Sequence, residues 1–248
     1  MLHKAIFFLV ASLASVSLAL PSPAVPNSQV RRGWVPSPSG TVSITGHVQY
    51  GSSIGVLGCK INTNRVAYWP YAVDCNNICV RLTNTTTGIT VTLLRIDESG
   101  GAHDISYDAW NYLLTGNPAT PGTAVPGGGF DVQYEYINPD DPECKALITD
   151  PEGKLPLMAA NSVNYVTECN RQPDSWVARN YQFWNINDAN CKEGWNDKCT
   201  LPPPKDGNQP KCPDGRELGY GIGIPVVLGP GDHKVKNIAY MTGEEVEA

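Results

Sequence analysis

The sequence predicts a mainly β protein that folds as a small closed barrel, with one short helix and a C-terminal extension. Ile89–Ile96 is a short run rich in β-branched and apolar residues, which is typical of a buried strand. Phe130–Ile137 alternates apolar and polar side chains, which is typical of a strand with one buried face. The 24 glycines and 21 prolines indicate many turns between such strands. The chain of 248 residues is long enough to bury a sizeable core.

The remaining elements of the barrel segment are expected in order along the chain. A first strand is predicted near Val42–Val48, where apolar and polar residues alternate, and another short strand at Cys79–Leu82. A helix is predicted over Tyr107–Leu114, because Ser106 is a suitable N-cap and Gly116 a suitable stop. A loop rich in glycine and proline separates this helix from the last strand.

The N-terminal residues have the pattern of a secretory signal peptide. Lys4 precedes the apolar run Ala5–Leu20, which is too short to span the roughly 30 Å hydrocarbon core of a membrane comfortably. We therefore expect a signal peptide at 1–19 and a candidate propeptide at 20–32. The propeptide ends at Arg31-Arg32, a dibasic site typical of the fungal secretory route, and the alternative is a flexible leader with two solvated arginines. The mature protein is expected to be secreted and soluble.

The charge balance restricts the class of partner. Lysine and arginine number 18 against 24 aspartates and glutamates, so the formal net charge is −6. Nucleic-acid binders rely on an excess of basic residues to neutralise phosphates. We therefore expect no nucleic-acid partner. We also expect no membrane partner, because no stretch after residue 20 is long and apolar enough to span a bilayer, and we expect a monomeric protein.

The eight cysteines all follow the predicted leader, and an even count in a secreted chain indicates four disulfides. They are Cys59, Cys75, Cys79, Cys144, Cys169, Cys191, Cys199 and Cys212. Their spacing alone leaves the pairing open. Cys75 and Cys79 have a plausible ligand spacing, but no second close pair completes a tetrahedral metal site. His47, His103 and His233 are far apart in the sequence and more typical of lone structural residues, so we expect neither a metal nor another cofactor.

One N-glycosylation sequon is present, at Asn84-Thr85-Thr86. It lies in a threonine-rich turn that ends at Gly88. The sequon predicts a surface glycan on Asn84.

Three stretches of the barrel segment match a pattern known from secreted proteins. Arg95–Asp97 followed by Gly100–Ser106 places an aspartate at the end of a strand, a glycine-rich turn, and an Asp-Ile pair before a helix. Asp74–Leu82 contains two close cysteines, and Phe130–Cys144 ends in another. These stretches resemble the barwin, expansin and cerato-platanin proteins. The resemblance implies a six-stranded double-psi β-barrel over residues 33–144.

The same resemblance implies disulfide partners. By analogy with cerato-platanins, Cys59 would pair with Cys75, and Cys79 with Cys144. The last four cysteines would then pair among themselves. The sequence departs from many barwin proteins at Glu98-Ser99, where they carry a cysteine.

Residues 145–248 are predicted to be a disulfide-stapled extension that packs on the barrel, and a small β domain is the alternative. Expansins carry a carbohydrate-binding β-sandwich after the barrel, and the aromatic stretch Trp176–Trp184 resembles its tryptophan region only faintly. Cys191–Cys212, which includes three consecutive prolines, indicates a stapled loop instead.

Asp104 is the main candidate for a functional residue. In the endoglucanases that share this barrel the matching aspartate is the general acid, and expansins need it for wall loosening. Hydrolysis normally takes two carboxylates, and Thr41–His47, where those enzymes place the second, contains none. Asp97 and Asp108 are substitutes by position, but Asp97 is also typical of a turn and Asp108 of a helix start. We therefore favour a role without catalysis. A cap of the following helix is the structural alternative for Asp104.

Aromatic residues near Asp104 predict a surface on which sugar rings stack. The candidates are Tyr68, Trp69, Tyr71 and Trp110. His103 and Asp104 would supply hydrogen bonds to sugar hydroxyls. The alternative is that Trp69 and Trp110 pack in the core, where large aromatic side chains are usually found.

The sequence therefore predicts a secreted, non-catalytic protein that binds or loosens cell-wall polysaccharide, chitin or cellulose, in an expansin-like groove. A second hypothesis is a cerato-platanin-like effector or elicitor that acts on a host protein. A barrel-type endoglucanase is the weakest of the three. The barrel resemblance supports all of them, because a fold does not choose between functions.

Overall fold

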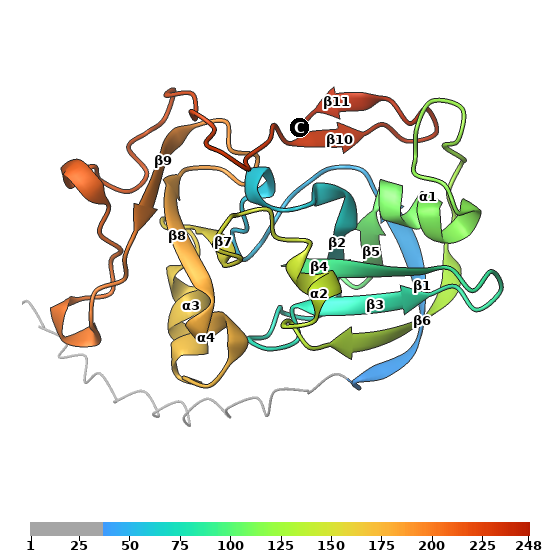
Figure 1. Cartoon of the computed structure of the whole chain (residues 1–248), viewed down its shortest axis with the longest axis horizontal. Coiled ribbons are helices and arrows are strands. Elements are labelled where there is room, and N and C mark those ends of the chain that lie inside the picture. Colours follow the sequence, from blue (N-terminus) through green and yellow to red (C-terminus); the bar gives the residue numbers. More distant parts are fainter. Residues whose placement is uncertain (1–36) are drawn as a thin grey trace, which may run out of the picture. The chain divides into compact units, whose positions relative to one another are not determined.

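The computed structural model describes residues 37–248, so the expected signal peptide at 1–19 and the candidate propeptide at 20–32 lie outside the described residues. Six strands close into a barrel (Figure 1). They are β1 (Ser39–His47), β2 (Val66–Trp69), β3 (Cys79–Thr83), β4 (Thr90–Glu98), β5 (His103–Ser106) and β6 (Phe130–Ile137). The closed barrel confirms the fold class predicted from the sequence.

The strand order around the barrel is β1-β5-β2-β4-β3-β6. Strands β1 and β5 are parallel, as are β2 and β4, and the other neighbouring strands are antiparallel. Parallel neighbours need long crossover connections, and here the chain passes through β2, β3 and β4 between the parallel strands β1 and β5. As a result β1, β5 and β2 lie side by side although they are far apart in the sequence.

Helix α1 (Tyr107–Thr115) follows β5 directly, close to the predicted position. Gly116 ends it in the left-handed conformation, with φ of 79°, and its backbone N–H donates to the carbonyl of Tyr112. A residue with a side chain is disfavoured at this φ, so the glycine defines the stop. Ser106 occupies the N-cap position, but its hydroxyl makes no capping hydrogen bond.

The barrel interior is filled by one cluster of buried side chains that come from all six strands and from α1. The strands contribute Ile44, Ala67, Trp69, Val80, Leu82, Val91, Leu93, Ile105 and Val132. Helix α1 adds residues that include Tyr107 and Trp110. These side chains alternate along each strand with residues that face outward.

A second buried cluster joins the outer face of the barrel to the residues after Cys144. Leu94 and Ile96 of β4 belong to it, together with Leu155, Leu157 and Phe183 of the extension. Strand β4 is therefore buried on both faces from Val91 to Ile96. Residues 145–248 thus share a core with the barrel segment.

The extension contains short elements connected by loops. They are the helices α3 (Val163–Asn170) and α4 (Trp176–Arg179) and the strands β7 (Leu155–Met158), β8 (Tyr181–Ile186), β9 (Gly194–Cys199), β10 (Lys236–Ile238) and β11 (Glu245–Glu247). Helix α2 (Pro142–Lys145) lies where the barrel segment joins the extension. Strands β7, β8 and β9 form one sheet, and β10 and β11 form a C-terminal hairpin. The 3-10 helices are η1 (Gly58–Lys60), η2 (Thr63–Arg65), η3 (Pro204–Asp206) and η4 (Pro213–Gly215). Within residues 37–248, no helix has the length and apolar character needed to cross a membrane.

All eight cysteines are in disulfides, as predicted, but only part of the predicted pairing is correct. Cys79 pairs with Cys144, as the resemblance implied. The predicted Cys59–Cys75 bridge is wrong, because Cys59 pairs with Cys191 and Cys75 with Cys169. Of the last four cysteines, only Cys199 and Cys212 pair with each other. The barrel segment and the extension share a core, so cysteines of the two parts face each other across it.

The sequon residue Asn84 was expected at the surface, but it is buried, and its glycosylation stays a prediction. Its amide nitrogen, the atom that would carry the glycan, donates to the carbonyl of Leu113 at 3.0 Å. Its side-chain oxygen accepts from the backbone N–H of Thr86 at 3.0 Å. The amide therefore holds the threonine-rich turn against the end of α1.

Candidate binding surface around Asp104

Asp104 lies on β5 between β1 and β2. Its register partners are Thr45 on β1 and Tyr68 on β2. The hydroxyl of Thr45 donates a hydrogen bond to the Asp104 carboxylate. The carboxylate remains partly exposed, and Ser106, not Asp104, occupies the N-cap position of α1. The helix-cap alternative for Asp104 is therefore wrong.

Tyr68 forms the floor beside Asp104. Its ring is buried, and its hydroxyl donates to the carbonyl of Gln49 at 3.1 Å. Burial raises the pKa of Tyr68 far above its ordinary value, and the charges of Asp97 and Asp104 raise it further. Tyr68 therefore stays a neutral phenol. Because its ring is covered, it supports the surface from below and is not the stacking platform that the sequence predicted.

His47 joins this group, although the sequence pattern indicated only a lone structural residue. Its ring centroid lies 4.6 Å from that of Tyr68. His47 and Thr45 are two residues apart on β1, so both side chains project from the outer face of the barrel. The alternation along β1 indicated that Thr45 and His47 share one face of the strand. Only the parallel pairing of β1 with β5 shows that this face lies next to Asp104.

Asp97 lies on the other side of Tyr68, as its register partner on β4. One carboxylate oxygen accepts hydrogen bonds from the backbone N–H groups of Ser53, at 3.0 Å, and Glu98, at 2.8 Å. These two bonds fix the loop before β2 to the end of β4. This is the turn role that the sequence left open for Asp97.

His103 faces away from Asp104, because successive residues of a strand point to opposite sides. Its ring packs edge-on against Trp69, with centroids 4.6 Å apart, and lies 6.4 Å from the ring of Tyr71. Burial lowers the pKa of His103 despite the nearby charge of Asp104, and the Arg95 guanidinium lowers it further. The predicted pairing of His103 with Asp104 at one site is therefore wrong.

Trp69 and Trp110 do not present faces for stacking, which corrects the sequence prediction. Each is only 1% exposed and belongs to the barrel interior. Trp110 stacks on Tyr107 with centroids 5.8 Å apart, and its indole N–H donates to the carbonyl of Gly128. Of the four predicted aromatic residues, Tyr71 is the one that is exposed.

Asp108 is likewise not part of the surface. Its side chain is buried, forms an ion pair with Arg65 and accepts from the backbone N–H of Ala119 at 2.7 Å. It therefore fastens the loop after α1 to η2. The expectation that Asp108 is a surface carboxylate is wrong.

The outer surface thus brings together Thr45, His47 and Asp104 over Tyr68, with Asp97 beside them. Such a group offers hydrogen-bond donors and acceptors to a polyol. Glycoside hydrolysis normally needs two carboxylates, and here Asp97 is engaged by two backbone N–H groups in fixing a turn. In the described part of the chain, no group of three or more His, Cys, Asp or Glu side chains is arranged to hold a metal ion.

Comparison with known proteins gives no match: no family model, no curated protein and no solved structure matches the chain. What is inferred about function below rests on the residues of this chain and on the resemblance described above.

Two half-buried histidines, His103 and His233, predict a pH dependence of stability. Burial lowers the pKa of both His103 and His233 in the folded protein. In the unfolded chain a histidine titrates near pH 6.5 and binds more protons below that pH than the folded protein does. Their contribution to stability is therefore complete above about pH 6.5 and is lost on acidification toward the lower folded pKa. The melting temperature is expected to fall between about pH 7 and pH 5.

Thermal melts of the wild type and of the double variant His103→Gln/His233→Gln test this expectation. The double variant is expected to lose less of its melting temperature over the same pH interval. A wild-type melting temperature that stays constant from about pH 7 to pH 5 would contradict it. The carboxylates with lowered pKa, such as Glu143, contribute at more acidic pH, because carboxylates titrate near pH 4 in unfolded chains.

Proposed function

We propose that the protein is a secreted, non-catalytic binder of cell-wall polysaccharide, and that the ligand lies over Thr45, His47 and Asp104. The observation that carries the proposal is the Asp104 carboxylate, which is partly exposed and oriented by the Thr45 hydroxyl. Neighbouring sugar hydroxyls donate well to an oriented carboxylate, since charge-assisted hydrogen bonds are the strong ones. The resemblance to expansins supports the same residue.

The proposed extracellular location is supported by the disulfides. Four disulfides indicate an oxidising environment such as the secretory route and the extracellular space. The predicted signal peptide supports the same location. Chitin and cellulose are the proposed ligands because both are neutral polymers of sugar rings whose hydroxyls match this surface.

Substitution of Asp104 by Asn tests the proposal. The variant keeps the shape of the side chain but removes the charge, so affinity for the polysaccharide is expected to fall about 10-fold. The melting temperature is expected to change little, because Asp104 is partly exposed. The measurement is a pull-down on insoluble chitin and cellulose, with isothermal titration of the matching soluble hexasaccharides.

Asp131→Asn is the matched control, since Asp131 is an exposed aspartate on β6. This variant is expected to bind as the wild type does. Equal binding by the Asp104 and Asp131 variants would exclude Asp104 from the binding surface. A release of reducing sugar by the wild type that Asp104→Asn abolishes would instead favour the endoglucanase hypothesis.

The effector hypothesis remains the second candidate, and an exposed apolar segment favours it. Ile222 is 76% exposed and Val227 81%, and Tyr220 and Ile224 are exposed nearby. Contiguous exposed apolar residues often mark protein-binding surfaces. Under this hypothesis, substitution of Ile222 and Val227 by Ser would reduce recognition by the host while polysaccharide binding stays unchanged.

A further inference from the structure

Two shallow hollows lie on the face formed by η2, the loop after α1 and the C-terminal hairpin. One, of about 300 Å³, is lined by residues that include Asn62, Thr63, Lys236 and Glu245. The other, of about 650 Å³, runs between the loop and the hairpin. Both volumes are in the range of small-molecule sites. Residues common to both hollows are Asn64, Ile238 and Glu245, so the two are neighbours.

This face borders the Asp104 surface. A narrow recess with a volume of about 10 Å³ is lined by His47 and Tyr68 on one side and by Asn64 and Ile238 on the other. His47 and Tyr68 belong to the surface around Asp104, whereas Asn64 and Ile238 line both hollows. The Asp104 surface and the two hollows are therefore neighbours, because His47 and Tyr68 share this recess with Asn64 and Ile238.

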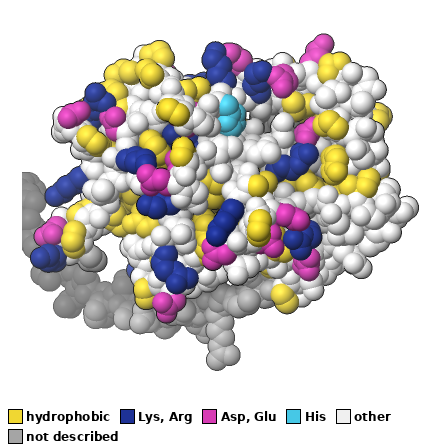
Figure 2. Space-filling model, in the orientation of Figure 1, with side chains coloured by type: hydrophobic (Ala, Val, Ile, Leu, Met, Phe, Trp, Pro, Cys, Tyr) yellow, Lys and Arg dark blue, Asp and Glu magenta, His cyan; other side chains and the backbone are white. Residues whose placement is uncertain are grey.

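The lining is amphipathic, and its lysines and Glu245 are in ion pairs, whereas no ion pair involves Glu244 in the described part of the chain. Pro118, Pro121 and Ile238 supply apolar surface in the larger hollow. Lys236 is neutralised by an ion pair with Glu245 across the hairpin. Figure 2 shows basic and acidic side chains close together at the edge where the hairpin lies. A sugar ring has apolar faces and a hydroxyl edge, so a neutral saccharide matches this lining better than an ionic ligand does.

Two polar side chains in the hollows are free to bind a ligand. The Asn64 amide and the Thr63 hydroxyl make no hydrogen bond to another residue in the described part of the chain. Both are partly exposed and line the smaller hollow. An amide offers donors and an acceptor, and a hydroxyl offers both, so together they satisfy vicinal sugar hydroxyls.

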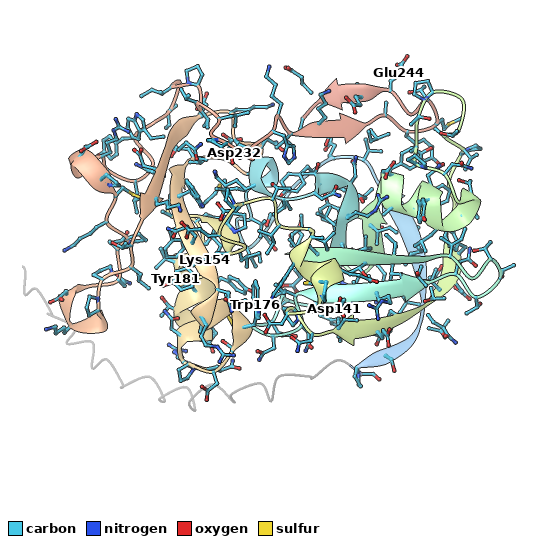
Figure 3. All side chains as sticks on the ribbon, viewed as in Figure 1. Asp141, Lys154, Trp176, Tyr181, Asp232 and Glu244 are labelled. Atoms are coloured by element: carbon cyan, nitrogen blue, oxygen red, sulfur yellow. A yellow bond between two sulfur atoms is a disulfide. The ribbon has the colours of Figure 1, made fainter. Side chains whose placement is uncertain are left out.

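The hairpin that forms one wall is fixed by hydrogen bonds to the barrel segment. The Asn237 side chain accepts from the backbone N–H of Tyr50 at 2.9 Å. The Tyr240 hydroxyl donates to the carbonyl of Gly127 at 3.0 Å, and the backbone N–H of Met241 donates to the Tyr107 hydroxyl at 3.2 Å. Figure 3 places Glu244 at the turn that follows. A wall already held in place loses little entropy when a ligand binds.

We propose that this face is a second saccharide subsite, centred on Asn64 and Thr63, that continues the Asp104 surface along one polysaccharide chain. The inference rests on the proposed function and adds to it that the ligand is a linear, neutral oligosaccharide long enough to occupy both regions. Binding therefore depends on chain length.

The test compares tri- and hexasaccharides of chitin and of cellulose by isothermal titration. The wild type is expected to bind the hexasaccharide at least about 5-fold more tightly than the trisaccharide. Asn64→Ala and Thr63→Val are each expected to weaken the hexasaccharide about 5-fold, the equivalent of one hydrogen bond, and to leave the trisaccharide unchanged. Asp104→Asn is expected to weaken both. Asn164→Ala, on the exposed face of α3, is the matched control and is expected to match the wild type.

The possible outcomes separate this inference from the proposed function. Equal affinity of the wild type for the two lengths, with no effect of Asn64→Ala or Thr63→Val, overturns the second subsite and leaves the Asp104 surface standing. No binding of any of the four oligosaccharides by the wild type overturns the proposed function and this subsite with it. Loss of trisaccharide binding in Asn64→Ala would also overturn the order of the two subsites.

Discussion

Removal of the Cys75–Cys169 disulfide, by the double variant Cys75→Ala/Cys169→Ala, is expected to lower the free energy of unfolding by about 4–5 kcal/mol. The two cysteines are 94 residues apart, so the bond closes a long loop and restricts the unfolded chain strongly. It also joins the barrel segment to α3 of the extension. Equilibrium unfolding in urea measures the loss.

The Cys199–Cys212 bridge supplies the matched control. Its two cysteines both lie in the extension and are only 13 residues apart in the sequence, so the bridge closes a short loop. Its removal is expected to cost less, about 3 kcal/mol or below. A cost equal to or larger than that of the Cys75–Cys169 variant would contradict the explanation by loop length.

Peptide mapping without reduction is expected to return Cys59 with Cys191 and Cys75 with Cys169. Recovery of a Cys59–Cys75 peptide would disprove the pairing described here.

Asp232→Ala is expected to lower the free energy of unfolding by about 3–5 kcal/mol, because it leaves the Lys60 ammonium buried without its partner. The two side chains are each only 2% exposed, and the Lys60 ammonium lies 2.7 Å from the nearer Asp232 oxygen. The ammonium also lies 3.6 Å from the centre of the Trp184 ring. Asn196 and the backbone N–H of Gly229 each donate to Asp232 at 2.8 Å. Figure 3 labels Asp232, which lies four residues before β10 in the sequence.

Two further variants identify the cause of this loss. Lys60→Met/Asp232→Asn is expected to recover part of the stability, because it removes the unpaired charge and keeps the volume of both side chains. Glu168→Ala breaks an exposed ion pair with Arg171 and is expected to change stability by only about 0.5 kcal/mol. Similar losses in Asp232→Ala and Glu168→Ala would contradict a role for burial.

Lys60 belongs to a short segment that is fastened to the extension at two successive residues. Cys59 and Lys60 lie in η1, between β1 and β2. Cys59 forms the disulfide with Cys191, and Lys60 forms the ion pair with Asp232. The carbonyl of Cys59 also accepts from the backbone N–H of His233 at 3.0 Å. The extension is therefore attached to η1 by a disulfide, an ion pair and a backbone hydrogen bond.

Local patterns in the sequence were sufficient for four of the six barrel strands, β1, β3, β4 and β6, and for α1, whereas the short strands β2 and β5 were not predicted. The β-branched run that becomes β4, the alternation along β6 and the stop at Gly116 reflect neighbours within a few residues, and such preferences do not need the rest of the chain. The same is true of the turn role of Asp97, whose partners include the adjacent residue Glu98.

The site was predicted in part. Asp104 was identified through a motif in the sequence, but Thr45 and His47 join it only because β1 and β5 pair in parallel. The strand geometry likewise sends His103 to the opposite side of β5, against Trp69, although it is the immediate neighbour of Asp104. Whether Trp69, Trp110 and Asp108 are exposed depends on which surfaces pack on them, and no local pattern contains that information.

The chain's own residue pattern thus determines the class of fold, four of the six barrel strands and the cysteine count, and its resemblance to known proteins determines the choice of Asp104. Tertiary packing decides how the cysteines pair, which aromatic residues are covered and which side chains surround Asp104. The physical reason is the distance along the chain over which each kind of interaction acts. Strand and turn preferences act between neighbours along the chain, whereas the Cys59–Cys191 and Cys75–Cys169 bonds and the β1–β5 register join residues that only the packed core brings together.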